Sequence, residues 1–136
     1  MKKLLIGGQA LMRLGSSRMS KDFDYIVNDK NSKSAFSHEN GIDYCNANGS
    51  KFFAEIWKME EKNNGEIASA QALFELKAYA FVQHCQNFFF QKADDCEYDM
   101  KFLVRNFGIK ESKIAKKYMT YGEYGEVVKI IDSVKK

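Results

Sequence analysis

The stretch LLIGGQALMRLGSSRMSKDFDYIV, residues 4–27, constrains the fold of this chain more than any other. Its first three residues are apolar and are followed at once by Gly7-Gly8, and the segment Gln9–Leu14 then has the apolar spacing of a helix. Gly15 follows that segment, as is typical of the position just after a helix. Asp22 and Asp24 then stand one residue apart in the otherwise apolar run Asp22–Val27, which predicts a second strand. The chain therefore begins as strand, glycine bend, helix and strand.

The rest of the sequence predicts one more strand and several helices. The elements expected are a short helix at Ser34–Glu39, a strand at Ile42–Cys45, a helix from about Phe52 to Lys62 that Asn63-Asn64-Gly65 ends, and helices at Ser69–Phe88, Asp95–Asn106, Lys110–Tyr118 and Glu123–Val134. Strands come early and helices late, so we expect an α+β fold. A small mixed β-sheet would occupy residues 1–66 and a helical part residues 67–136, within a single domain.

Composition narrows the class of protein. With 136 residues, of which 45% are hydrophobic, the chain is long enough for one globular domain. Its three cysteines are odd in number and match no zinc spacing, which favours reduced thiols in the cytoplasm. The apolar run after Lys3 is too short for a signal peptide, and no stretch approaches the roughly 20 apolar residues of a membrane span. We therefore expect a soluble, cytoplasmic protein without membrane contact.

Two aspartates stand one residue apart in the second predicted strand. Because side chains alternate along a strand, Asp22 and Asp24 should share a face, roughly 6.6 Å apart along the chain. Two neighbouring carboxylates repel each other unless a cation lies between them, and Mg²⁺ prefers such oxygen ligands. Solvent-facing strand edges commonly carry such charges, so the pair alone does not indicate a site.

The residues before this pair favour a phosphate ligand. Gly7 and Gly8, placed between a strand and a helix, allow backbone N–H groups to approach a phosphate closely, and the start of the helix adds a favourable dipole. Arg18 and Ser20 offer a guanidinium group and a hydroxyl for phosphate oxygens. A tight turn explains the glycines alone. Glycines, phosphate ligands and acids in this order are the parts that metal-assisted nucleotidyl transfer requires.

The segment GGQALMRLGSSRMSKDFDYIV resembles the signature of the DNA polymerase β-type nucleotidyltransferase superfamily. More narrowly, it is similar to the AbiEii-like proteins, many of which are toxins of toxin–antitoxin systems. The family pattern is Gly-Gly, a small residue, a helix, a glycine, Arg, Ser or Thr, and Asp-x-Asp on a strand. The matching residues are Gly7, Gly8, Ala10, Gly15, Arg18, Ser20, Asp22 and Asp24. Gln9 departs from the wider superfamily, which often has a phosphate-binding serine there.

Two later segments continue the resemblance. ALFELKAYAFVQH, Ala72–His84, is similar to the family's lysine-bearing helix, and KADDCEYDMKFL, Lys92–Leu103, to the helix that follows it. Lys77 lies on an apolar helical face, where its ammonium needs a carboxylate or a nucleotide triphosphate as partner unless it reaches water. The resemblance favours the triphosphate. Asp95 and Asp99 either hold Lys77 or an arginine in place or form a solvated face.

Two-metal transfer usually needs a third carboxylate. Asp43 lies between Ile42 and Tyr44, in the apolar–acid–apolar pattern of a strand, and the resemblance places an acid there as well. Glu55 lies in a helical pattern and would face solvent. We expect Asp43 to be the third carboxylate, with no third acid as the main alternative and Glu55 as a minor one.

Residues and resemblance together predict an Mg²⁺-dependent nucleotidyltransferase that moves a nucleoside monophosphate from an NTP to an acceptor hydroxyl. The expected metal ligands for two Mg²⁺ ions are Asp22, Asp24 and Asp43; the expected nucleotide-binding residues are Gly7, Gly8, Arg18, Ser20 and Lys77; and the catalytic set is Asp22, Asp24, Asp43 and Lys77. The resemblance implies RNA such as tRNA, or a protein, as acceptor, and a cognate antitoxin as a partner.

Other functions remain open at the level of the sequence. The main alternative is a catalytically degenerate module of the same fold that binds a nucleotide or a protein. A small-molecule nucleotidyltransferase of the aminoglycoside type is less favoured. The lysines of residues 110–117, with Tyr118, Tyr121 and Tyr124 nearby, are either an RNA-binding surface or the solvated and packing faces of two helices.

Overall fold

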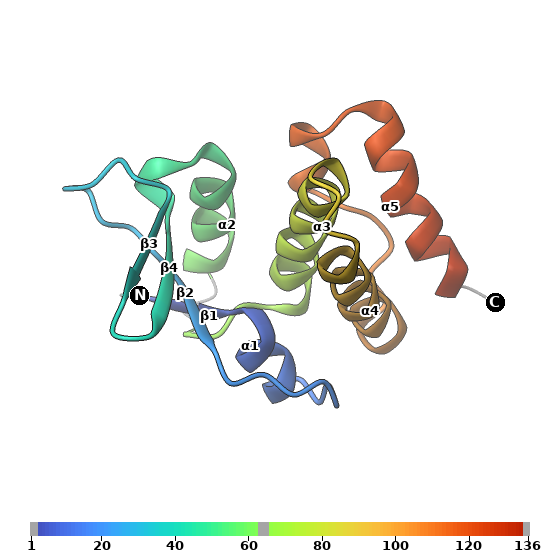
Figure 1. Ribbon diagram of the computed structural model, residues 1–136, viewed down its shortest axis with the longest axis horizontal. Coiled ribbons are helices and arrows are strands. Elements are labelled where there is room, and N and C mark those ends of the chain that lie inside the picture. Colours follow the sequence, from blue (N-terminus) through green and yellow to red (C-terminus); the bar gives the residue numbers. More distant parts are fainter. Residues whose placement is uncertain (1–2, 63–65, 135–136) are drawn as a thin grey trace. The chain divides into compact units, whose positions relative to one another are not determined.

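Four strands form a mixed sheet in the N-terminal part of the computed structural model, which describes residues 3–62 and 66–134 (Figure 1). They are β1 (Leu4–Ile6), β2 (Phe23–Val27), β3 (Phe36–Glu39) and β4 (Ile42–Asn46). Their order across the sheet is β1-β2-β4-β3. The central strands β2 and β4 are parallel, whereas β1 and β3 are antiparallel to their neighbours.

The chain divides into two compact units, Met1–Leu73 and Phe74–Lys136. The first holds the sheet with α1 (Gly7–Arg13), the 3₁₀ turn η1 (Ala47–Gly49) and α2 (Lys51–Glu61). The second holds most of α3 (Ala70–Gln86), together with α4 (Phe90–Phe107), the 3₁₀ turn η2 (Ala115–Tyr118) and α5 (Tyr121–Val134). The expected α+β class, with a small mixed sheet and a helical C-terminal half, is confirmed. The expected break at residues 63–65 lies outside the described residues.

The core of the first unit follows from the apolar pattern of its elements. All of β1 is buried, and Ile26 of β2 is fully buried. In α2, Phe52, Phe53, Ile56 and Trp57 are buried, as their spacing on one helical face predicts. Burial of a large apolar side chain contributes about 1.5–3 kcal/mol, so these residues hold α2 in place. Ser50 starts the helix, because its hydroxyl accepts a hydrogen bond from the Phe53 N–H at 3.3 Å.

In the second unit, the buried faces of three helices form a separate core. Its members are Phe74, Ala78 and Val82 of α3, Ala93, Cys96, Met100, Leu103 and Val104 of α4, and Val127, Ile130 and Ile131 of α5. Glu75 of α3 is also fully buried, and its carboxylate accepts hydrogen bonds from the segment 112–115. A buried carboxylate with this many donors ties the irregular chain before η2 to α3.

Two expected helices are wrong. Residues 36–39 form the strand β3, because Asn40 and Gly41 both have positive φ (53° and 76°) and make a two-residue hairpin turn to β4. Residues 110–114 are irregular, and only Ala115–Tyr118 forms a 3₁₀ turn. There the backbone N–H groups of 113–115 bond to Glu75 instead of continuing a helix.

Cys45, Cys85 and Cys96 form no disulfide bond within the residues that the structure describes. In the described part of the chain, no helix has both the length and the apolar composition that crossing a membrane requires.

Candidate functional site

One row of paired residues crosses all four strands. Ile6 on β1 pairs with Asp24 on β2, Asp24 with Asp43 on β4, and Asp43 with His38 on β3. Paired residues on neighbouring strands project from the same face, and the strands lie about 4.8 Å apart. Asp24, Asp43 and His38, which we call the carboxylate row, therefore stand side by side. The expectation that Asp43 lies on a strand beside Asp24 is confirmed.

The glycine bend, formed by Gly7 and Gly8 directly after β1, lies against this row. Gly7 has φ of +68°, a left-handed conformation that other residues adopt only with strain. A Cβ on Gly7 would lie 2.5 Å from Oδ2 of Asp24, too close for any side chain. Gly7 thus leaves the space that the Asp24 carboxylate fills. The expected convergence of bend and acid is present for this pair.

Gly8 makes a similar approach to Ser20. A Cβ on Gly8 would lie 2.6 Å from the Ser20 hydroxyl oxygen, so only glycine fits here. The loop that carries Ser20 is anchored by Gln9, whose side-chain amide donates to the Ser20 carbonyl at 2.7 Å. The serine hydroxyl therefore lies beside the first turn of α1. Because α1 has only seven residues, few peptide dipoles are aligned, and the close backbone approach is the stronger feature.

Asp22 and Arg18 are less closely tied to the row. The second strand begins at Phe23 and not at Asp22, so Asp22 is an exposed residue of the preceding loop. The alternation that placed it on the face of Asp24 does not extend to it. Arg18 is partly exposed on the same loop, and its backbone N–H donates to the Ser16 hydroxyl at 3.3 Å. Glu55, the minor alternative for the third acid, lies on α2 and outside the row.

His38 is the residue of this site that the sequence interpretation missed. Its Nδ1 lies 2.5 Å from Oδ1 of Asp43, and the two side chains are 65% and 58% exposed. Since a carboxylate only accepts, the imidazole Nδ1–H donates this hydrogen bond. The signal was present in the sequence, because the Asn-Gly pair at 40–41 is typical of a two-residue hairpin turn. Such a turn places His38 opposite Asp43.

Cys45 lies two residues beyond Asp43 on the same strand face. Burial, together with the negative charges of Asp24 and Asp43, raises the pKa of the Cys45 thiol to about 12. The thiol therefore stays protonated at neutral pH and is not a nucleophile.

The residues of the row suit a metal ion that is coordinated partly by a bound substrate. Among residues 3–62 and 66–134, no group of three or more His, Cys, Asp or Glu side chains is arranged to hold a metal ion. Mg²⁺, however, commonly binds to one or two carboxylates together with substrate phosphates and water. Asp24 and Asp43 supply two carboxylates on adjacent strands, and the lack of a side chain at Gly7 lets the Asp24 carboxylate lie against the backbone of the bend. The donor set thus fits Mg²⁺ bound with a nucleotide and not a metal cage made by the protein alone.

Lys77 belongs to the second unit, where its ammonium already has a carboxylate partner. Its Nζ lies 3.1 Å from Oδ2 of Asp99, with side-chain exposures of 18% and 0%. The interpretation of Asp99 as part of a solvated face is therefore wrong, and its role in holding Lys77 is confirmed. Asp95 instead accepts a hydrogen bond from the Gln91 side chain at 3.3 Å.

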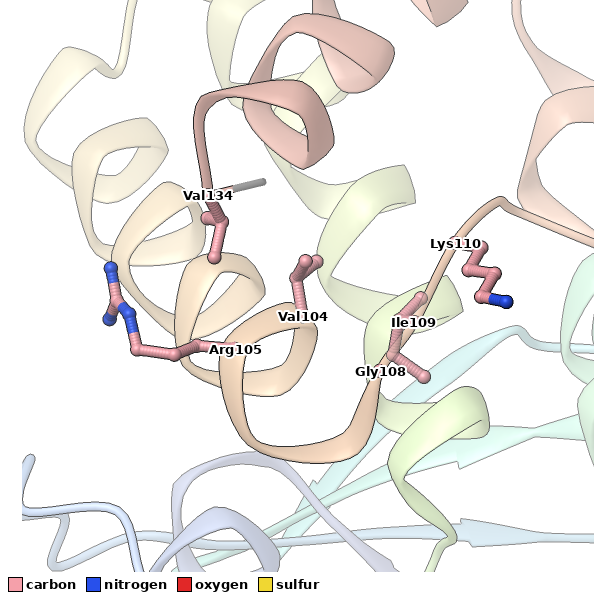
Figure 2. A pocket seen from close by; sticks show the side chains of 6 residues that line it. All are labelled: Val104, Arg105, Gly108, Ile109, Lys110 and Val134. Atoms are coloured by element: carbon pink, nitrogen blue, oxygen red, sulfur yellow. The ribbon is translucent and has the colours of Figure 1, made fainter. Parts of the chain in front are cut away.

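A pocket of about 270 Å³ opens in the second unit and contains none of the expected site residues. It is lined by Val104, Arg105, Gly108, Ile109, Lys110 and Val134. Figure 2 shows the Val104 and Val134 side chains facing each other, with Arg105 and Lys110 on opposite sides. Its lining is mainly aliphatic, and the two cationic side chains do not converge on one point.

Comparison of the chain with family models, with curated proteins and with solved structures gives no significant match. Strand register and the glycine contacts place Gly7, Asp24, Asp43 and His38 in one neighbourhood, with Gly8 and Ser20 in contact beside it.

Proposed function

We propose that this chain is an Mg²⁺-dependent nucleotidyltransferase, which moves a nucleoside monophosphate from an NTP to an acceptor hydroxyl. The observation that carries the proposal is the position of Asp24, whose carboxylate lies against the Gly7 bend while Asp43 stands in register on the next strand. A glycine bend beside paired carboxylates offers backbone N–H groups for phosphate oxygens and oxygen ligands for their metal. The resemblance of residues 7–27 to the polymerase β-type signature agrees with this chemistry.

The acidic residues have the metal-binding role in this proposal. Asp24 and Asp43 supply carboxylate oxygens, and Asp22, exposed on the loop before β2, is the further ligand that joins them when nucleotide binds. When bound, Mg²⁺ would neutralise phosphate charge in this transfer, in which the acceptor oxygen bonds to the α-phosphorus, the bond to pyrophosphate breaks and the hydroxyl proton passes to water.

Neutral and basic groups around the bend have the phosphate-binding role. The Ser20 hydroxyl beside Gly8 and the backbone N–H groups of the bend donate hydrogen bonds to phosphate oxygens. Arg18, on the same loop, adds positive charge. The proposal does not require Lys77, because Asp99 already pairs with that ammonium.

The direct test is transfer of labelled nucleotide. The purified chain is incubated with each α-labelled NTP, Mg²⁺ and either total tRNA or a protein mixture that includes any cognate antitoxin. We expect label transfer, and a loss of roughly 100-fold or more in Asp24→Asn, because a charged group that stabilises the transition state is removed. Asp94→Asn, which removes an exposed carboxylate of α4, should transfer label at the wild-type rate. Transfer that is insensitive to Asp24→Asn, or no transfer to any acceptor, would contradict the proposal.

One observation favours the alternative of a catalytically degenerate module that binds a nucleotide or a protein. In the described residues, no group of three or more His, Cys, Asp or Glu side chains is arranged to hold a metal ion. Equilibrium dialysis with labelled Mg²⁺·ATP distinguishes the two functions. Binding that Asp24→Asn abolishes, without transfer to any acceptor, would indicate the degenerate module.

A further inference from the structure

His38 lies at the outer end of the carboxylate row, on the edge strand β3. Its hydrogen bond to Asp43 joins two side chains that are both more than half exposed. Exposed pairs of this kind contribute little to stability, because water competes for both partners. The stability of the fold therefore does not explain why a histidine occupies this position.

The two carboxylates of the row are held from opposite sides. Asp24 Oδ2 lies against Gly7, which follows β1, and Asp43 Oδ1 accepts its hydrogen bond from His38 on β3. Since β2 and β4 are the two central strands, both neighbours are on the outer sides of the aspartate pair. Asp43 also has a second carboxylate oxygen, and carboxylates that bind metals are commonly fixed by a hydrogen bond to a group that does not touch the metal.

We infer that His38 is a positioning residue for the cation at Asp24 and Asp43, and that it acts by holding the Asp43 carboxylate through Nδ1–H. This inference rests on the proposed function, since it concerns the metal that the transfer reaction requires. His38 itself is neither a metal ligand nor a proton acceptor in this role. What matters is a hydrogen-bond donor at the position of Nδ1.

Asparagine and glutamine at position 38 can distinguish the effect of the hydrogen-bond donor from the effect of the imidazole ring. The amide nitrogen of asparagine stands where Nδ1 of histidine does, whereas that of glutamine stands nearer to Nε2. His38→Asn should therefore keep the hydrogen bond to Asp43, and His38→Gln and His38→Ala should lose it. Because His38 is exposed, all three variants should fold, which circular dichroism checks. His84→Asn, at the other histidine of the chain, is the matched control.

The readout is Mn²⁺ affinity of the full chain, measured by electron paramagnetic resonance with and without a non-hydrolysable nucleoside triphosphate analogue. We expect His38→Ala and His38→Gln to weaken Mn²⁺ binding by roughly 10–100-fold, the usual effect of losing a group that orients a metal ligand. His38→Asn and His84→Asn should stay close to the wild type. Asp24→Asn identifies the row as the binding site by abolishing Mn²⁺ binding.

Several outcomes would overturn the inference. Tighter Mn²⁺ binding by His38→Ala would show that His38 competes with the metal, and equal binding by all His38 variants would show that it has no effect. Loss in His38→Asn as large as in His38→Ala would assign the effect to the ring, and no Mn²⁺ binding by the wild type with or without the analogue would remove the site.

The same variants separate this inference from the proposed function. Mn²⁺ binding that follows the expected order in a protein that transfers no label contradicts the transferase function and leaves the role of His38 intact. Label transfer together with unchanged Mn²⁺ affinity in His38→Ala contradicts the role of His38 and leaves the transferase function intact.

Discussion

At the scale of single residues, Gly7 shows how one missing Cβ shapes the candidate site. Its left-handed φ and the oxygen of Asp24 each exclude a side chain, by backbone strain and by direct overlap. Gly108 offers a natural comparison, since its φ of +65° is nearly the same but nothing lies within 4 Å of its Cβ position. Comparing the two positions therefore separates the free-energy cost of a left-handed backbone from the cost of overlap with the Asp24 carboxylate.

We therefore predict that Gly7→Ala destabilises the protein more than Gly108→Ala does. Gly108→Ala should cost about 1–2 kcal/mol, the strain of a left-handed alanine. Gly7→Ala should cost more, because the Asp24 carboxylate must also move, and nucleotide binding should fall with it. Urea unfolding measures the first effect and equilibrium dialysis the second. Equal losses of stability would mean that the Asp24 side chain moves aside freely.

Cys45 gives a second prediction at this scale. Because burial and the two aspartates raise the pKa of its thiol to about 12, its thiolate is scarce at pH 8. Labelling of the native protein by a maleimide, followed by mass spectrometry, should be slow at Cys45 and should accelerate in urea. Asp43→Asn removes one of the negative charges and should speed labelling of the folded protein. Fast labelling of Cys45 in the unaltered native chain would contradict the environment described for it.

At the scale of elements, hydrogen bonds from side chains determine where several segments begin and end. Glu75 accepts bonds from the Ser112 hydroxyl at 2.6 Å and from the N–H groups of Lys113, Ile114 and Ala115 at 2.7, 3.1 and 2.8 Å. This carboxylate satisfies the backbone donors at the start of η2. The segment expected as a helix at Lys110–Tyr118 is irregular for that reason.

Glu75→Gln should therefore be strongly destabilising. The amide nitrogen that replaces one carboxylate oxygen cannot accept, so at least one buried N–H loses its partner, at a cost of about 1–3 kcal/mol each. Glu97→Gln, which breaks a partly exposed pair with Lys101, should change stability by less than about 1 kcal/mol. Both free energies of unfolding are measured in urea at pH 7. A Glu75→Gln loss as small as that of Glu97→Gln would contradict the role assigned to Glu75.

The start of α5 predicts a pH dependence. The Thr120 N–H donates to Glu123 at 2.6 Å, the Glu123 N–H donates to the Thr120 hydroxyl at 3.1 Å, and Gln86 donates to the same carboxylate. The bond from the Thr120 backbone, followed by that from Gln86, lowers the pKa of Glu123 below its ordinary value of 4.5. A lowered pKa in the folded state means that the ionised form stabilises the fold above pH 4.5, and that this contribution is lost as the pH falls through the folded value.

Accordingly, Glu123→Gln should be less stable than the wild type at pH 7, and the difference should shrink below pH 4.5. Urea unfolding at pH 7 and at pH 3 measures both differences. Glu126→Gln, which alters an exposed residue of the same helix, should show no comparable change with pH. A stability difference between Glu123→Gln and wild type that grows on acidification would contradict a stabilising role for the ionised Glu123 carboxylate.

Helices and strands are predicted correctly from this sequence mainly where the pattern that determines them lies within the segment itself. The apolar spacing of α2 and the glycine that ends α4 are local signals, and the structure confirms both helices. The Asn-Gly turn is local too, but the helix expected at residues 34–39 is wrong, because this turn pairs residues 36–39 with β4. The contact of Glu75 with residues 112–115 joins segments far apart in the sequence, and no periodicity reveals it.

At the scale of the whole molecule, the sheet and the glycine bend belong to one compact unit and the Lys77–Asp99 pair to the other. The sequence could predict Gly7, Asp24 and Asp43 as candidates, since their residue types and spacing carry the chemistry. It could not predict that Asp24 would contact Gly7 or that His38 would join Asp43, because strand order and register determine those contacts. Lys77 was assigned to the same site from the resemblance, whereas its ammonium is paired within the helices of the second unit.

The two-residue turn at Asn40-Gly41 has a consequence for how such a site can vary. Side chains along a strand alternate between faces, so one residue inserted into that turn and taken up as a shift of β3 would send His38 to the opposite face and bring Ser37 or Glu39 into its place. The partner of Asp43 would then change although neither aspartate had been touched. Loop length in this hairpin is thus a means by which chemistry at the sheet could diverge while the strands themselves stay the same.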